Sequence, residues 1–244
     1  MIADMRAVDA PFETVLVGGT SAAFVDSNDA IFSRVPIAGA MIVVSTFVLL
    51  FLMFGSLLVP LKAIVLNTLS LTAVFGFIVW VFQEGNGADL LGFTATGLTD
   101  TSMPILMFCV AFGLSMDYEV FLLSRMKEEY DRTGDNDLAV ATGLERTGRL
   151  VTAAALLLSI TFFAFATSGV TFIKLFGLGL AIAVLVDAFI VRSTLVPALM
   201  KLAGDWNWWA PEPLRRLHDR IGISEGEPPE ELAVDVEPAT VGAP

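Results

Sequence analysis

The sequence predicts an all-α transmembrane helix bundle of about five spans, and two observations support this prediction. Hydrophobic residues make up 55% of the 244 residues. They occur in blocks of about 20, the length that an α-helix needs to cross the hydrocarbon core of a bilayer. The predicted spans are residues 37–58, 63–82, 103–123, 150–167 and 175–200.

Local features place the ends of these spans. No charged residue occurs between Arg34 and Lys62, and the polar connection that follows the first span is only residues 60–62. So short a connection would return the second span antiparallel to the first. The third span has Pro104 in its first turn, where a missing N–H costs little. Lys174 precedes the fifth span.

The polar connections differ in charge, and this difference predicts the orientation. The stretch 124–149 carries five Lys or Arg residues, and the segment after Met200 carries four more. The connection 83–100 carries none, and residues 1–36 have five acidic and only two basic side chains. Cytoplasmic loops are enriched in cations. We therefore expect a multi-pass protein of the cell inner (plasma) membrane, with its N-terminus outside and its C-terminus in the cytoplasm.

The longest polar connection, residues 124–149, is expected to contain a cytoplasmic surface helix. Asp135 and Asn136 are residue types whose side chains accept hydrogen bonds at helix N-termini. Gly148 is a residue type that commonly ends a helix. We therefore expect a surface helix from about Asp135 or Asn136 to about Gly148.

The two ends of the chain are not spans. Residues 1–36 are expected to be a small extracytoplasmic αβ remnant, with a strand over residues 14–17, a glycine turn and a helix that begins near Ser21. Such a unit is too small to bury a core of its own. The transmembrane domain is expected to cover residues 37–203.

The C-terminal part is expected to change character twice. Residues 204–223 contain three tryptophans, which favour a membrane interface, and a short amphipathic helix over residues 214–221. They are expected to form a cytoplasmic interfacial segment. Residues 224–244 are acidic and rich in proline, which is typical of a disordered tail.

Two predicted spans contain ionisable residues, which are expensive in the membrane and are functional candidates by default. The third span contains Asp117 followed by Tyr118, and the fifth contains Asp187 and Arg192. Both aspartates lie about 18–21 Å along their helices from the outer side, so the two carboxyl groups can be neighbours. A carboxyl group in an apolar environment can exchange a proton near neutral pH. Tyr118 could hydrogen-bond such a carboxyl group, and Arg192 could hold it ionised.

Structural interpretations of these polar residues stay open. Asp187 and Arg192 are five positions apart, which is not an ideal spacing for a pair on one helix. Arg192 could instead extend to the cytoplasmic interface, and the two aspartates could be hydrogen-bonded structural groups. Glu119 is expected to be solvated or structural. The small residues of the fifth span are expected to be helix-packing contacts: Gly177, Gly179, Ala181 and Ala183.

Four runs of the sequence resemble the MMPL (mycobacterial membrane protein large) family of the RND transporter superfamily. They are GLSMDYEVFLLSRMKEEYDRTGD at 113–135, ERTGRLVTAAALLL at 145–158, GLGLAIAVLVDAFIVRSTLVPALM at 177–200 and NWWAPEPLRRLHDR at 207–220. The resemblance implies export of lipids or other hydrophobic molecules, driven by the proton gradient. It implies that Asp117 and Tyr118 form the proton relay pair of the C-terminal half. Asp187 and Arg192 would be their companions.

The resemblance covers residues 14 to about 224 and implies a partner. A complete member of the family has twelve spans in two similar halves, and this chain matches only the last five. We therefore expect three partners. They are the lipid bilayer, a hydrophobic or lipid substrate, and the N-terminal half of a transporter, which would contain the second Asp-Tyr pair. We expect no export by the isolated chain. The N-terminus is expected outside although no signal peptide is recognised. A preceding membrane span that carried it across the membrane would explain this.

Other function classes are less well supported. Nothing in the sequence is basic enough to suggest nucleic acid, and no pattern suggests a cofactor, a metal site or an enzyme. Two intramembrane aspartates would also suit an intramembrane aspartyl protease, and residues 197–199 form the Pro-Ala-Leu element of that class. However, the order Asp117-Tyr118 is the reverse of the protease Tyr-Asp pattern. A non-transporting membrane scaffold or an inactive fragment is the remaining alternative.

Overall fold

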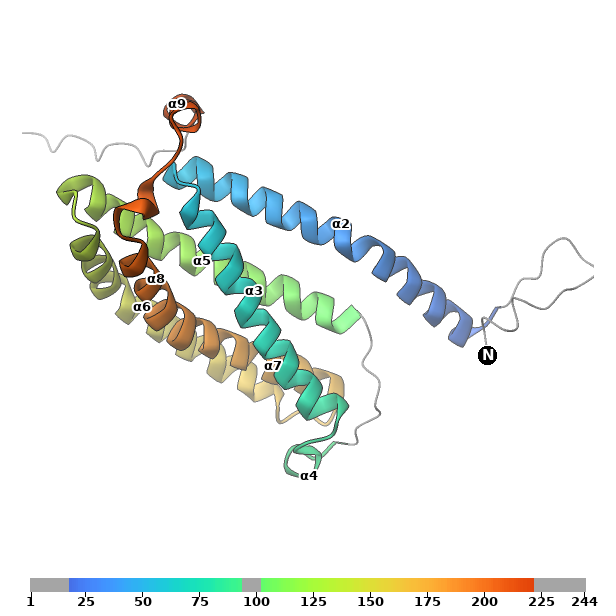
Figure 1. The fold of residues 1–244 in the computed structure, drawn as a ribbon. Coiled ribbons are helices and arrows are strands. Elements are labelled where there is room, and N and C mark those ends of the chain that lie inside the picture. Colours follow the sequence, from blue (N-terminus) through green and yellow to red (C-terminus); the bar gives the residue numbers. More distant parts are fainter. Residues whose placement is uncertain (1–17, 94–101, 222–244) are drawn as a thin grey trace, which may run out of the picture.

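The structure, a computed structural model, describes residues 18–93 and 102–221. All regular elements in these residues are helices (Figure 1). In chain order they are α2 (Thr20–Phe54), α3 (Leu58–Ile78), η1 (Val79–Gln83), α4 (Ala88–Leu91), α5 (Ser102–Thr133), α6 (Asn136–Phe165), α7 (Thr171–Leu185), η2 (Val186–Leu195), α8 (Val196–Ala203), η3 (Gly204–Trp208) and α9 (Glu212–Ile221). Five helical runs are long and apolar enough to cross a membrane: α2, α3 with η1, α5, α6, and α7 through η3.

The turn between the first two spans lies at residues 55–57 rather than at the predicted 60–62. Gly55 ends α2 in the left-handed conformation (φ 63°), and its N–H donates to the Phe51 carbonyl at 2.8 Å. The Ser56 hydroxyl accepts from the first two N–H groups of α3, at 3.2 and 3.4 Å. The predicted boundary is wrong because Gly55 and Ser56, which end one helix and cap the next, are both uncharged. The apolar block therefore continues through the turn without a visible break.

The helix predicted near Ser21 is not separate from the first span. It is the beginning of α2, which runs unbroken from Thr20 through Pro36 to Phe54. The predicted strand at residues 14–17 and the predicted tail at residues 224–244 lie outside the described residues.

The second hairpin is formed by α5 and α6, both longer than the predicted spans. Gly134 (φ 69°) follows α5, and Asp135 caps α6 by accepting a hydrogen bond from the Leu138 N–H at 3.1 Å. The predicted cap at Asp135 is therefore confirmed, but the predicted helix end near Gly148 is wrong. Helix α6 continues through Gly148 because it packs along α5, where the buried Gly143 lies against Met126.

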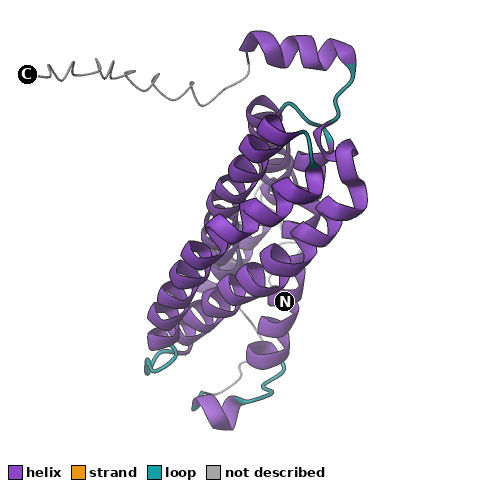
Figure 2. Cartoon of the chain, turned by 90° about the vertical axis from the view of Figure 1, so that its left-hand side faces the viewer, coloured by secondary structure: helices purple, strands orange, loops and turns teal. Residues whose placement is uncertain are grey.

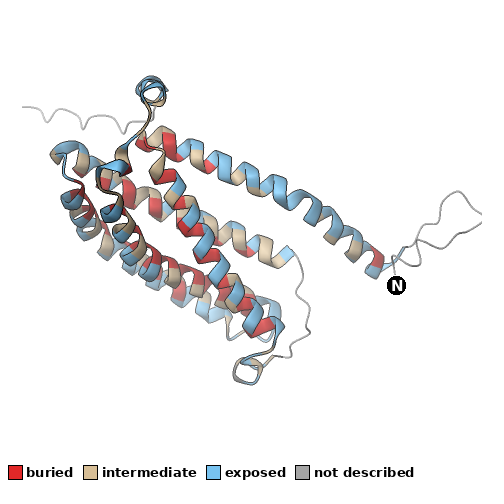
Figure 3. Ribbon diagram, in the orientation of Figure 1, coloured by how far each residue is buried: buried red, intermediate tan, exposed pale blue. Residues whose placement is uncertain are grey.

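The last span is the most enclosed helix of the bundle. Of its most apolar 18-residue window 61% is buried, against 17% for that of α2. Figure 3 shows the same contrast: most of α2 is exposed along its length, and its buried residues gather near its ends. Figures 1 and 3 also show α2 diverging from the other four spans. Contacts between α2 and the bundle centre on Leu50 and Phe54, which belong to a buried cluster with Val59 and Met126.

Two glycines let α7 approach its neighbours closely, as predicted. A Cβ atom on Gly177 would lie 2.4 Å from the Phe165 Cβ and 2.6 Å from the Phe162 carbonyl oxygen. A Cβ atom on Gly179 would lie 2.4 Å from the Met107 sulfur. Small residues therefore set the spacing between α7, α6 and α5.

Candidate functional site

Asp187 and Arg192 form a buried ion pair inside the last span. Both lie in η2, a π-helical segment of ten residues. Because π-helical hydrogen bonds join residues five apart, this segment places the two side chains on the same side of the helix. Arg192 Nε donates to Asp187 Oδ2 at 2.7 Å, and the whole residues are 3% and 8% exposed. The spacing of five, which is not ideal on an α-helix, therefore allows pairing in this π-helical segment. Arg192 does not extend to the interface.

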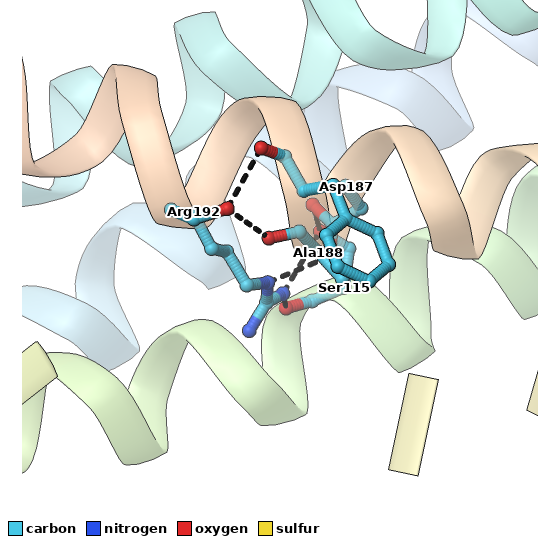
Figure 4. Close-up of polar contacts among 6 residues, drawn as sticks. Ser115, Asp187, Ala188 and Arg192 are labelled. Carbon is cyan, nitrogen blue, oxygen red and sulfur yellow. Dashed lines mark hydrogen bonds and ion pairs between the residues drawn. The ribbon is translucent and has the colours of Figure 1, made fainter. Parts of the chain in front are cut away.

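Ser115 of α5 completes this cluster from the neighbouring helix (Figure 4). Its hydroxyl donates to Asp187 Oδ1 at 2.7 Å, and it is buried. Arg192 Nη2 donates to the Ser115 carbonyl oxygen and lies 3.3 Å from its hydroxyl oxygen. The ion pair therefore binds side-chain and main-chain atoms of α5, so the two helices are held in one register.

Tyr118 contacts this cluster, whereas Asp117 does not. The Arg192 guanidinium carbon is 5.3 Å from the centroid of the Tyr118 ring, a cation–π contact. Asp117 is exposed, and no hydrogen bond or ion pair joins its side chain to another described residue. Ser115 and Asp117 are two positions apart, so they point to nearly opposite sides of α5 at about 100° per residue. The two aspartates, which could have been neighbours, are therefore not in contact. The hydrogen bond that Ser115 donates to Asp187 is consistent with their matched depth.

A cavity of about 10 Å³ borders the cluster. It is close to the smallest space that holds one water molecule. Its lining is mostly apolar and comes from α5, α6, α7 and η2, with Tyr118, Asp187 and Arg192 as its main polar groups. Arg192 Nη1 is buried and has no hydrogen-bond partner among the described residues. The site therefore combines a fixed ion pair with one unused donor on its cation.

A second polar group lies closer to the α5–α6 turn. Glu119 is 5% exposed, so of the two expected roles, solvated or structural, the solvated one is wrong and the structural one remains. It lines a small cavity together with Lys62 of α3. Lys62 was predicted to lie in the connection between the first two spans. It lies within α3 instead, because α3 begins four residues before it. Its Nζ donates to Asn207 Oδ1 and lies 3.0 Å from the Met200 sulfur.

Sequence reasoning missed two residues that hold these groups in place. Ser115 sits in the same run as Asp117, and a serine in a span can bond across helices, but its partner cannot be read from the sequence. Asn207 was assigned only to an interfacial segment, yet it is fully buried and forms hydrogen bonds with Ser56, Lys62, Asn136, Met200 and Gly204. Among the described residues, no group of three or more His, Cys, Asp or Glu side chains could hold a metal ion.

Comparison with known proteins gives the family context of this site. The chain is 48% identical over 227 residues to a putative membrane protein of Streptomyces coelicolor, covering 93% of this chain and 32% of the relative. It is 42% identical over 231 residues to the trehalose monomycolate exporter MmpL3 of Mycobacterium tuberculosis, covering 94% and 24%. It is 35% identical over 228 residues to the mycolic acid-containing lipids exporter MmpL11 of Mycolicibacterium smegmatis, covering 93% and 24%.

The chain thus spans about a quarter to a third of the length of these relatives. The family model of the MMPL family matches residues 3–223, which is most of the chain. The chain belongs to the MMPL family.

Proposed function

We propose that this chain is the C-terminal transmembrane portion of an exporter that moves lipids or other hydrophobic molecules and is driven by the proton-motive force. Asp117 and Tyr118 are its proton relay, and Asp187 and Arg192 hold the relay helix in position. One relative named as a trehalose monomycolate exporter and one named as an exporter of mycolic acid-containing lipids support this substrate class. We propose transport rather than catalysis.

The position of Asp117 carries the proposal. It lies fifteen residues from the start of α5, about 22 Å along the helix, and its side chain is exposed. An ionisable group facing hydrocarbon at that depth costs at least about 2.5 kcal/mol. A carboxyl group kept at such a cost is expected to face a partner helix or a hydrated path, where it can exchange protons.

A second transmembrane unit therefore belongs against this face of α5. The relatives are three to four times as long as the chain, which fits a partner that contains the other spans. We propose that the N-terminal half of the transporter covers Asp117. The α5–α6 turn and its cations lie on the cytoplasmic side of the inner membrane, because loops rich in Lys and Arg are found on that side.

The rival functions predict other arrangements. An aspartyl protease needs two carboxyl groups that share one water, whereas Asp187 is paired with Arg192 and bonded to Ser115. A non-transporting scaffold would not depend on a carboxyl group at Asp117. The experiment below separates transport from a scaffold, and cleavage of a model transmembrane substrate would support the protease.

The test is a chimera in which this chain replaces the matching segment of the M. tuberculosis exporter MmpL3. The chimera, the isolated chain and the chimera with Asp117→Asn are reconstituted in proteoliposomes with an imposed proton gradient. We expect the chimera to export trehalose monomycolate. The isolated chain and the Asp117→Asn chimera should show only the flux seen without a gradient.

A matched control uses the same helix outside the apolar region. Glu128 is exposed and pairs with Arg125 at 2.7 Å, so Glu128→Gln should leave export unchanged. Gradient-driven export by the Asp117→Asn chimera would refute the relay and favour a scaffold. Export by the isolated chain would refute the need for a second half.

A further inference from the structure

The short helix α9 lies across one end of the bundle. In Figure 1 it is seen nearly end-on above the C-terminal end of α2, and in Figure 2 it runs across the top at a steep angle to the spans. A helix perpendicular to the spans lies parallel to the membrane plane, as interfacial amphipathic helices do. Two exposed tryptophans, Trp206 and Trp209, precede it at the same end.

One face of α9 is apolar and is turned toward the spans. The residues of this face follow the i, i+3, i+4, i+7 pattern of an amphipathic helix: Leu214, Leu217, His218 and Ile221. His218 packs against the end of α2, where its ring lies edge-on to Phe51 with centroids 6.2 Å apart. Leu217 and Ile221 stay 43% and 56% exposed, so the described part of the protein covers them only in part.

The charges of α9 are arranged around this apolar face. At about 100° per residue, Arg215 and Arg220 fall on its two margins. Glu212, Arg216 and Asp219 fall between them on the opposite side. Arg216 already has a partner, because its Nη2 lies 3.3 Å from Glu212 Oε1. The two margin arginines are exposed, and no hydrogen bond or ion pair joins their side chains to another described residue.

We propose that α9 binds anionic phospholipid of the leaflet at this end of the bundle. Leu217 and Ile221 enter the boundary between headgroups and acyl chains, and Arg215 and Arg220 contact headgroup phosphates on either side of the helix. The acidic residues then face water. In this arrangement the exposed apolar face is buried in lipid, and the positive margins lie against negatively charged headgroups. It depends only on the membrane-spanning bundle and not on transport.

The experiment places a polarity-sensitive fluorophore on either face of α9 in the full chain. Cys109, the single cysteine, is replaced by alanine, and Leu217→Cys or Asp219→Cys provides the labelling site. The labelled proteins are reconstituted in phosphatidylcholine vesicles with increasing fractions of phosphatidylglycerol. Brominated lipid quenches a label in the bilayer, and iodide quenches a label in water. We expect bromine quenching at position 217, rising with phosphatidylglycerol, and iodide quenching at position 219.

The arginines are tested in the same assay. A margin arginine near an anionic surface contributes about a fivefold gain in binding. At one fixed phosphatidylglycerol fraction, Arg215→Gln and Arg220→Gln should therefore each lower the ratio of bilayer-bound to water-exposed label by about fivefold. Arg216→Gln is the matched control and should change it little. Iodide quenching at position 217 in all vesicles would refute the proposal.

Two further outcomes would also refute it. Protection of position 217 from both quenchers would mean that protein, such as a second copy of the chain, covers the face instead of lipid. An equal effect of Arg216→Gln and the margin variants would mean that overall charge, not the helix orientation, governs binding. Because export is not measured, either failure leaves the proposed transport function untouched.

Discussion

Arg192 donates to Asp187 across five positions of one helix, at 2.7 Å, and the same guanidinium donates to the Ser115 carbonyl of α5. The π-helical turn thus converts an unfavourable spacing into a buried ion pair that joins two spans. A buried pair is compensated only while both partners are present. The consequences can be measured on the folded chain in detergent.

Removing the anion of this pair should destabilise the bundle strongly. Asp187→Asn leaves the Arg192 charge buried without its counter-ion, which costs about 3–5 kcal/mol. The free energy of unfolding in denaturant titrations measures the loss. The control is Glu128→Gln, which breaks the exposed Arg125–Glu128 pair and should cost no more than about 1 kcal/mol. Equal losses would contradict the assignment of a compensated buried pair.

Removing the serine hydroxyl should have a smaller effect at the same place. Ser115→Ala takes a donor from Asp187 Oδ1 inside the bundle, and a buried acceptor without its donor costs about 1–3 kcal/mol. Thermal unfolding should therefore occur at a lower temperature. The matched variant is Ser45→Ala, whose exposed hydroxyl bonds only to the Ile42 carbonyl of its own helix. A shift as large for Ser45→Ala would count against the cross-helix role of Ser115.

A methyl group on Gly177 should separate two spans. Gly177→Ala would place Cβ within 2.6 Å of α6 atoms, and overpacking of this kind costs about 1–3 kcal/mol. Gly148→Ala in α6 meets no atom within 4 Å and should stabilise by about 0.5–1 kcal/mol, because alanine is the better helix former. The two substitutions should thus move the thermal midpoint in opposite directions. A fall for both would contradict the packing argument.

The junction at Asn207 should control access to the C-terminal segment. Its side-chain nitrogen lies within 3.1 Å of acceptors on Asn136, Met200 and Gly204. Asn207→Ala removes these bonds and should speed trypsin cleavage after Arg215 and Arg216, because the segment opens more often. Asn86→Ala in the exposed loop at the other end is the control. Unchanged cleavage by the Asn207 variant would show that the junction does not hold the segment.

Much of the fold follows from local features of the sequence. Apolar blocks of span length predict five helices correctly, since a bilayer-length helix needs only a run of apolar residues. Asp135 is identified as a cap by its residue type, and Gly177 as a packing contact by its size. The less accurate boundaries fall at uncharged stops such as Gly55, and at Gly148, where packing on α5 carries the helix past a residue that often ends one.

The sequence by itself determined that Asp117, Asp187 and Arg192 lie within spans, because hydropathy depends only on the order of residues. The structure added Lys62 to the ionisable residues of the spans, since α3 begins at Leu58. The tertiary structure alone decided how they are paired. Ser115 and Asp187 meet across 72 positions of the chain, and a π-helical turn, not the usual α-helical one, aligns Asp187 with Arg192. Packing between helices determines which side of α5 faces the inside of the bundle. Asp117 therefore lies on its outer surface.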